Sequence, residues 1–227
     1  MTREHYLELL GQLDHAMQEL GDLVEHTIDA AMLALNSGDV ASAQKLIEGD
    51  NEIDRRRHEI DEQAFAIIAT QQPVASDLRL LTSAFTISAE LERIGDYAAG
   101  IAKLTLQMAA ESLPRRLEDI ESMAIITGDL LHRAMRAFKD RDVAAAAAVW
   151  GRDDEVDELY ESVFKHEVNE MARDTASIRR GTYLLWVAHN IERMADRVTN
   201  IAENVAFVVT GDVPTFREGI RSASLPG

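Results

Sequence analysis

The sequence predicts an all-α protein of two pseudo-symmetric three-helix bundles, in which six long antiparallel helices arise from an internal duplication. Three observations support this prediction. Ala, Leu, Ile and Glu dominate a chain of 227 residues that has only 4 prolines, a composition that favours long helices. Apolar residues recur at helical spacing between widely separated breaks. Two motifs also recur in the same order roughly one half of the chain later.

Short polar or proline-containing segments divide the chain into helices. They lie at 36–39, 72–73, 113–114, 139–142, 174–177 and 211–214. Asp39 is suited to cap the helix that follows it, and Pro73 is expected to begin a helix rather than continue one. Segments of about 30 residues correspond to helices roughly 45 Å long, and short turns between them favour antiparallel bundles.

The duplication is visible in two motifs. Residues 92–96 (Glu-Arg-Ile-Gly-Asp) align with 192–196 (Glu-Arg-Met-Ala-Asp) at an offset of 100, and residues 50–54 (Asp-Asn-Glu-Ile-Asp) align with 153–157 (Asp-Asp-Glu-Val-Asp) at an offset of 103. Helical composition alone does not explain two repeats in the same order. The prediction is a first bundle over 1–112, a second over 113–211, and a flexible tail over 212–227.

The bulk composition narrows the functional classes. A formal net charge of −17 argues against nucleic acid as a ligand and against unaided adsorption to an anionic membrane. The chain has no cysteine, which excludes thiolate metal sites and suits a reducing compartment. The longest apolar run covers residues 143–150, far short of the roughly 20 residues of a spanning helix. We expect a cytoplasmic protein, not inserted in the membrane, that associates with it only peripherally through partners.

Four pairs of acids share the spacing acid-x-x-x-Asp. They are Asp50/Asp54, Glu92/Asp96, Asp153/Asp157 and Glu192/Asp196. On a helix such residues share one face, with Cβ atoms about 5–6 Å apart, so their carboxylates repel unless a cation lies between them. Mg²⁺, Mn²⁺, Ca²⁺ and iron ions bind to such oxygen ligands. Chance alone gives roughly seven such pairs, usually on a solvated face, but recurrence in both repeats predicts metal sites.

The apolar seam predicts the direction in which these acids point. With positions 91 and 94 at heptad positions a and d, Glu92 and Asp96 fall at b and f, away from the core. Glu192 and Asp196 have the same register. A surface site differs from that of di-iron bundles, whose ligands point inward and include Glu-x-x-His, a spacing that the sequence lacks.

Other residues have less specific interpretations. Arg93 and Arg193 could orient the carboxylates or contact a bound phosphate, although surface salt bridges are favoured. The 7 histidines occupy no repeated position and are interpreted as structural, while Trp150 and Trp186 are expected in the core. The sequence contains no Walker-type loop and no recognisable nucleophile motif, so no enzymatic activity is predicted.

The same segments resemble the PhoU family, accessory regulators of bacterial phosphate-specific transport. The resemblance covers nearly the whole chain and is firmest at 46–50, 72–79, 91–96, 191–196 and 200–203. It implies multinuclear surface metal clusters of iron, zinc, manganese or magnesium, with the eight paired acids as ligands. It also implies a negative regulator of the phosphate-starvation response that contacts a sensor histidine kinase and the ATPase subunit of the phosphate ABC transporter. A homodimer is expected.

The second repeat differs from the first in ways that bear on the site. Residues 194–195 are Met-Ala, where the commonest form in the family is Ile-Gly. Gly100 and Lys103 stand where Asn200 and Glu203 stand in the second repeat, so the clusters would differ in nuclearity if Asn200 or Glu203 is a ligand. Two alternatives to a metal-binding adaptor stay open. One is a metal-dependent phosphatase acting on a phosphorylated signalling partner, and the other is a structural bundle that binds metal only incidentally.

Overall fold

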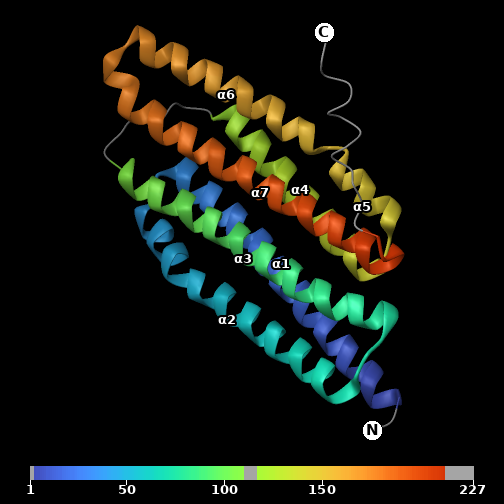
Figure 1. The fold of residues 1–227 in the computed structure, drawn as a ribbon. Helices are drawn as coiled ribbons and strands as arrows, with labels where there is room; N and C mark the ends of the chain where they lie inside the picture. The colour runs from blue at the N-terminus through green and yellow to red at the C-terminus, as the bar shows by residue number, and fades with distance from the viewer. Residues whose placement is uncertain (1–2, 110–116, 213–227) are drawn as a thin grey trace, which may run out of the picture.

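The computed structural model describes residues 3–109 and 117–212. The first repeat comprises α1 (Arg3–Ser37), α2 (Val40–Gln71) and α3 (Ala75–Gln107). The second comprises α4 (Glu118–Asp140), α5 (Val143–Trp150), α6 (Asp153–Arg173), a 3₁₀ turn (Thr175–Ser177) and α7 (Ile178–Thr210). These two ranges contain no strand, and the predicted all-α class is confirmed (Figure 1).

Capping residues fix the turns where the sequence predicted breaks. The Asp39 carboxylate accepts hydrogen bonds from the amides of Ala41 and Ser42 at 3.0 and 3.1 Å, which confirms it as the N-cap of α2. Gly211 ends α7 with φ at +84°, a left-handed conformation that glycine adopts without a Cβ penalty.

Pro73 does not begin α3, so that prediction was wrong by two residues. The connection places Gln72 in the left-handed region and Val74 in extended backbone, and α3 begins at Ala75. Proline disfavours helical backbone in the residue that precedes it. The turn therefore closes around Pro73 before helical geometry resumes.

The fifth helical segment is interrupted, which the sequence analysis did not predict. α5 and α6 are separated by Gly151 and Arg152. The Arg152 guanidinium pairs with Asp129 of α4 and with Glu155 of α6, each at 2.8 Å, so a tertiary contact holds the break. As a result, Asp153 lies in the first turn of α6, where the helix dipole favours carboxylates.

The two repeats meet along α3 and α7, which lie at the centre of the molecule (Figure 1). α3 packs against α1 and α2, and α7 packs against α4, α5 and α6. α1 also contacts α4, and one cluster of buried apolar side chains runs through both repeats. The predicted pair of three-helix bundles is confirmed, with the split α5–α6 segment as the middle member of the second bundle.

Buried or half-buried ion pairs join one repeat to the other. Glu90 of α3 is only 6% exposed, and its carboxylate lies 3.1 Å from Arg93 and 3.4 Å from Arg197 of α7. At the other contact between the repeats, Arg141 donates two hydrogen bonds to the Asp14 carboxylate of α1, at 2.8 and 3.0 Å. These long-range pairs orient the two bundles relative to each other.

One predicted boundary and most of the predicted tail fall outside the described residues. The division between residues 112 and 113 lies in the gap between 109 and 117, and of the predicted flexible tail only residue 212 is described. Among the helices in the described ranges, none is both long enough and apolar enough to cross a bilayer.

Candidate metal-binding site

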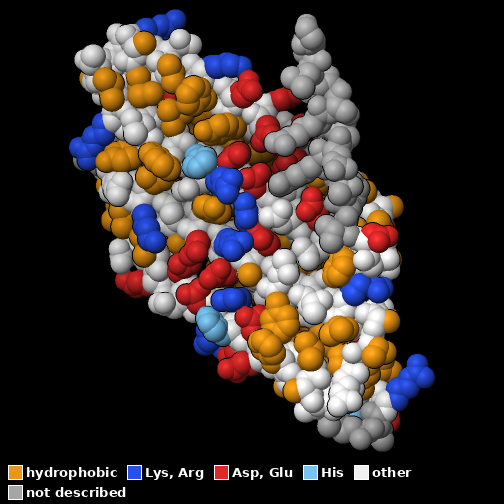
Figure 2. Space-filling model, in the orientation of Figure 1, with side chains coloured by type: hydrophobic (Ala, Val, Ile, Leu, Met, Phe, Trp, Pro, Cys, Tyr) orange, Lys and Arg blue, Asp and Glu red, His pale blue; other side chains and the backbone are white. Residues whose placement is uncertain are grey.

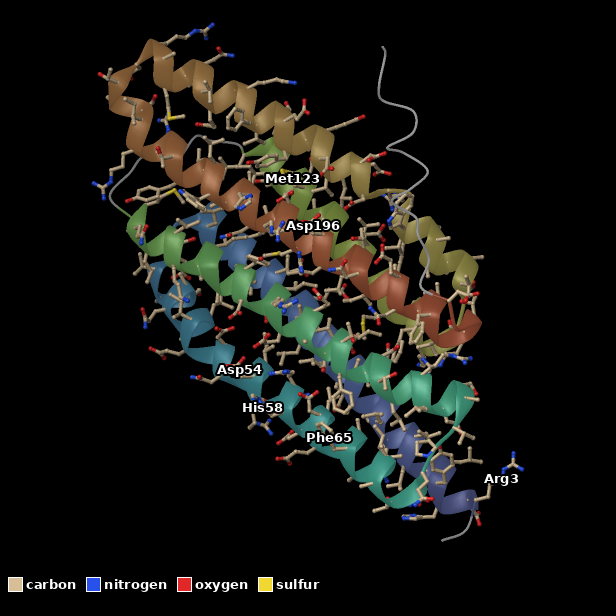
Figure 3. The ribbon with its side chains drawn as sticks, viewed as in Figure 1. Arg3, Asp54, His58, Phe65, Met123 and Asp196 are labelled. Carbon is tan, nitrogen blue, oxygen red and sulfur yellow. The ribbon has the colours of Figure 1, made fainter. Side chains whose placement is uncertain are left out.

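The first carboxylate cluster joins two helices. Asp50 and Asp54 lie on α2, and Glu92 and Asp96 lie on the neighbouring α3 (Figure 3 labels Asp54). All four side chains lie outside the buried core, as the heptad register predicted for Glu92 and Asp96. Burial, and then the charges of Asp96 and Asp54, raise the pKa of Asp50. Burial, followed by the charge of Asp54, raises the pKa of Asp96. The acids of each helix therefore lie close enough to acids of the other for their charges to raise one another's pKa values.

The second cluster has the same plan. Asp153 and Asp157 lie on α6, and Glu192 and Asp196 lie on α7 (Figure 3 labels Asp196). Burial, and then the charge of Asp196, raise the pKa of Asp157. Burial raises the pKa of Glu192 as well, with further contributions from Asp196, Asp157 and Asp153. The structure thus brings the eight predicted acids together as two groups of four.

An apolar contact beneath the first cluster sets the distance between α2 and α3. Gly95 lies between Glu92 and Asp96 in sequence, and a Cβ added to it would lie 2.6 Å from Cδ1 of Ile53. Both residues belong to the buried interior. At the equivalent positions the second repeat has Ala195 and Val156, also buried. Val156 has one carbon fewer than Ile53, and Ala195 has one carbon more than Gly95. The two pairs therefore have the same total number of side-chain carbons.

The two clusters differ in their neighbouring cations. In the first repeat the charge of Lys103 lowers the pKa of Asp50 and Asp96, and the charge of Arg57 lowers that of Glu92; in each case burial, which raises the pKa, has the larger effect. The second repeat has Glu203 in place of Lys103 and Tyr160 in place of Arg57. The second cluster therefore has fewer neighbouring cations at these two positions.

One oxygen of the second cluster lacks a hydrogen-bond donor within the described ranges. Oε2 of Glu192 is buried, and no described residue donates a hydrogen bond to it. Nδ1 of His189 lies 3.4 Å away, close enough for an ion pair but without hydrogen-bond geometry. A buried carboxylate oxygen without a donor, among carboxylates that repel it, fits a hard cation.

The carboxylates of each cluster are neighbours, but they do not converge on a common point. Within the described ranges, no group of three or more Asp, Glu or His side chains converges to hold an ion. Helical carboxylate side chains have several rotamers available, so ligation from both helices requires them to turn toward a shared ion. The chemistry of the donor set fits a metal ion, and its coordination geometry stays a prediction.

The two arginines beside the acids form ion pairs, as the favoured interpretation predicted. Nη1 of Arg93 lies 3.1 Å from Glu90, and Nη1 of Arg193 lies 2.8 Å from Asp196. A side-chain hydrogen bond with Tyr97 raises the pKa of Arg193 further. Arg193 therefore orients one predicted ligand, whereas Arg93 pairs with Glu90 of its own helix.

The prediction that Trp186 belongs to the core was wrong, because its side chain is 55% exposed. The buried positions of α7 in this region are Leu184, Val187, Ala188 and Ile191. Trp186 falls on the opposite side of the helix, which the spacing of this seam could have indicated. A large aromatic side chain is not by itself evidence that a residue lies in the core.

The chain is similar to known proteins of one family. The PhoU domain family model matches residues 17–105 and 120–205. The Rhizobium meliloti (strain 1021) phosphate-specific transport system accessory protein PhoU homolog is 36% identical over 208 residues, covering 91% of this chain and 88% of that protein. The Escherichia coli (strain K12) phosphate-specific transport system accessory protein PhoU is 34% identical over 192 residues, covering 85% and 80%.

Solved structures agree with the sequence comparisons. The crystal structure of PhoU from Pseudomonas aeruginosa aligns with a TM-score of 0.87 at 32% identity, covering 91% of this chain and all of that one. Each repeat carries one match to the family model, in keeping with the duplicated fold. The chain therefore belongs to the PhoU family.

Proposed function

We propose that this chain is a regulatory accessory protein of phosphate-specific transport whose two carboxylate clusters bind metal ions. The observation that carries the proposal is the facing of carboxylates across two helices in each repeat, together with the buried Glu192 oxygen that lacks a donor. The names of the relatives, which describe accessory proteins of phosphate-specific transport, supply the biological context.

The donor set limits the choice of metal. Carboxylate oxygens favour hard cations such as magnesium, manganese and iron, and zinc also accepts them. Four acids in each repeat can share more than one ion, so we infer multinuclear clusters. A bound cation would neutralise the repulsion among the carboxylates and, at the surface, keep coordination positions open to a partner or to phosphate.

We infer an adaptor role rather than an enzymatic one. The chain would restrain the phosphate-starvation response by contacting a sensor histidine kinase and the ATPase subunit of the phosphate transporter, as a cytoplasmic homodimer held at the membrane by these partners. One face of the molecule supports such contacts. Acidic and basic side chains lie along its middle, between hydrophobic patches over α6–α7 and over α2–α3 (Figure 2).

The proposal is tested in a strain that lacks its own copy of this protein and carries a reporter driven by a phosphate-starvation promoter. The test variant replaces the four acids of α3 and α7 with their amides: Glu92→Gln, Asp96→Asn, Glu192→Gln and Asp196→Asn. At high phosphate the wild-type chain should repress the reporter and the variant should not.

A matched control neutralises acids of the same spacing elsewhere. Glu25 and Asp29 of α1 also form a Glu-x-x-x-Asp pair, so Glu25→Gln with Asp29→Asn should leave repression intact. Protein levels are compared by immunoblot. Full repression by the cluster variant at wild-type protein level would contradict the proposal.

A further inference from the structure

The exposed Trp186 lines a pocket on the second repeat, between α6 and α7. Its walls are Tyr160, Thr182, Leu185, Trp186 and His189, and its volume is about 280 Å³. The Trp186 and His189 rings meet edge to face with centroids 5.8 Å apart, and the Tyr160 ring lies 6.3 Å from His189. Three aromatic rings therefore border one small opening. Trp186 is exposed and the other two rings are half-buried, and tryptophan and tyrosine are enriched in binding hot spots.

Negative charge borders the pocket on the side of the second cluster. His189 lies 3.4 Å from Oε2 of Glu192, and Glu192 in turn lies near Asp157 and Asp153. No lysine or arginine is among the lining residues. Aromatic faces attract a cation through their quadrupole, and a carboxylate at the edge adds a charged acceptor. Both features favour a positively charged occupant and disfavour an anion.

The first repeat has a cation at the position equivalent to Tyr160. Arg57 stands there in place of Tyr160, close enough for its charge to lower the pKa of Glu92. The positions of Trp186 and His189 are Thr86 and Ala89, so the first repeat has no aromatic pocket. At this one position the first repeat thus has a guanidinium and the second has a three-ring pocket, whereas Arg193 pairs with Asp196 elsewhere in the second cluster.

We propose that the pocket of Tyr160, Trp186 and His189 receives an arginine side chain from a protein partner. A planar guanidinium stacks on aromatic faces and is less strongly hydrated than an ammonium group. The bound arginine would occupy, beside Glu192, the place that Arg57 takes beside Glu92. The inference names the partner chemistry of the accessory role proposed above and rests on that role, but it does not require a bound metal.

The probe is a capped pentapeptide, acetyl-Gly-Gly-Arg-Gly-Gly-amide, and its counterpart with citrulline, which keeps the planar shape without the charge. Binding to the metal-free full chain is followed by the NMR signal of the Trp186 indole N–H, assigned with the Trp186→Thr variant. The arginine peptide should shift this signal in a saturable way, at least fivefold more tightly than the citrulline peptide. Equal binding of the two peptides would overturn the proposal.

Two variants convert pocket residues to those of the first repeat, and a third is a control. Binding is then measured from the peptide by saturation-transfer NMR. Trp186→Thr and His189→Ala should each weaken arginine binding at least fivefold. Phe65→Thr, which removes a 64% exposed aromatic from α2, should not change it. Undiminished binding in both pocket variants, or an equal loss in the control, would show general attraction to an acidic surface and refute the inference.

Failure of this inference is distinguishable from failure of the proposed function. The peptide measurement contains no metal and no transporter component. Absence of arginine binding, alongside intact repression of the reporter by the wild-type chain and its loss in the cluster variant, removes the pocket proposal alone. If instead the chain binds no metal and does not repress the reporter, the peptide measurement can still show arginine binding.

Discussion

The contact between Gly95 and Ile53 offers a quantitative test of how the helices that carry the first cluster are spaced. The perturbation is Gly95→Ala, alone and combined with Ile53→Val. The double variant reproduces the Ala195 and Val156 combination of the second repeat. The equivalence of the two repeats predicts that the double variant packs well although the glycine substitution alone does not.

The expected magnitudes follow from the distances. The new Cβ would lie 2.6 Å from Cδ1 and 3.3 Å from Cγ2 of Ile53, whereas carbon atoms prefer about 3.5–4.0 Å. Overpacking costs about 1–3 kcal/mol, and replacing a helical glycine by alanine returns about 1 kcal/mol, so Gly95→Ala should lose up to about 2 kcal/mol. Ile53→Val alone should lose about 0.5–1.5 kcal/mol through the cavity that it leaves.

The stability of the double variant distinguishes coupled from independent effects of the two substitutions. The alanine methyl fills the space that the isoleucine Cδ1 leaves, so the double variant should be more stable than the sum of the single losses by about 1–2 kcal/mol. Urea unfolding of metal-free protein, followed by circular dichroism at one protein concentration, gives the free energies, and an unchanged m-value confirms comparable states. Additive losses, within about 0.5 kcal/mol, would refute the idea that Gly95 and Ile53 set the helix spacing.

Three further predictions concern charge. Glu90→Ala should destabilise the fold by about 1–3 kcal/mol in urea unfolding because it leaves Arg197 unpaired in a half-buried site, whereas Glu170→Ala, which removes a surface partner, should cost about 0–1 kcal/mol; equal losses would contradict this account of the contact between repeats. Five of the cluster acids, Asp50, Glu92, Asp96, Asp157 and Glu192, have raised pKa values in the folded state, so their protonation adds stability that is complete below the unfolded values of 3.8 and 4.5 and is lost as the pH rises through the raised ones. The unfolding free energy of metal-free protein should therefore increase as the pH falls from neutral through the raised pKa values, with a smaller slope in the variant that has amides in place of the α3 and α7 acids, and identical slopes would contradict this assignment. Lys103→Glu, which installs the charge of Glu203, should tighten cation binding by the first cluster in a competition titration with a metal indicator, and unchanged affinity would show that Lys103 does not act on that cluster.

Much of the fold could be predicted because its signals are local. Asp39 caps the helix that begins directly after it. The apolar seam that includes Leu91 repeats every three or four residues, and each break is a short segment. The break at Gly151 could not be predicted in the same way, since one glycine costs a helix only about 1 kcal/mol. A distant contact, between Arg152 and Asp129, holds that break, and sequence spacing does not reveal such a pairing.

The candidate site could likewise be predicted only where its signals are local. The carboxylate pairs share a helical face by spacing alone, and their recurrence marks them among 40 acids. The spacing did not show that α2 faces α3, that Glu90 reaches Arg197 across the repeats, or that Trp186 faces outward. The first two are tertiary facts, whereas the third was available from the register of the α7 seam.

The central claim is that the repeated acids are metal ligands. The most direct measurement is the metal content of the chain, purified without an affinity metal or a chelator, by plasma mass spectrometry. Wild type is compared with Glu92→Gln/Asp96→Asn, with Glu192→Gln/Asp196→Asn, and with the α1 control pair. The account predicts several ions per chain, a partial loss in each cluster variant and no loss in the control. A folded wild-type chain without metal, or equal metal in all four proteins, would contradict it.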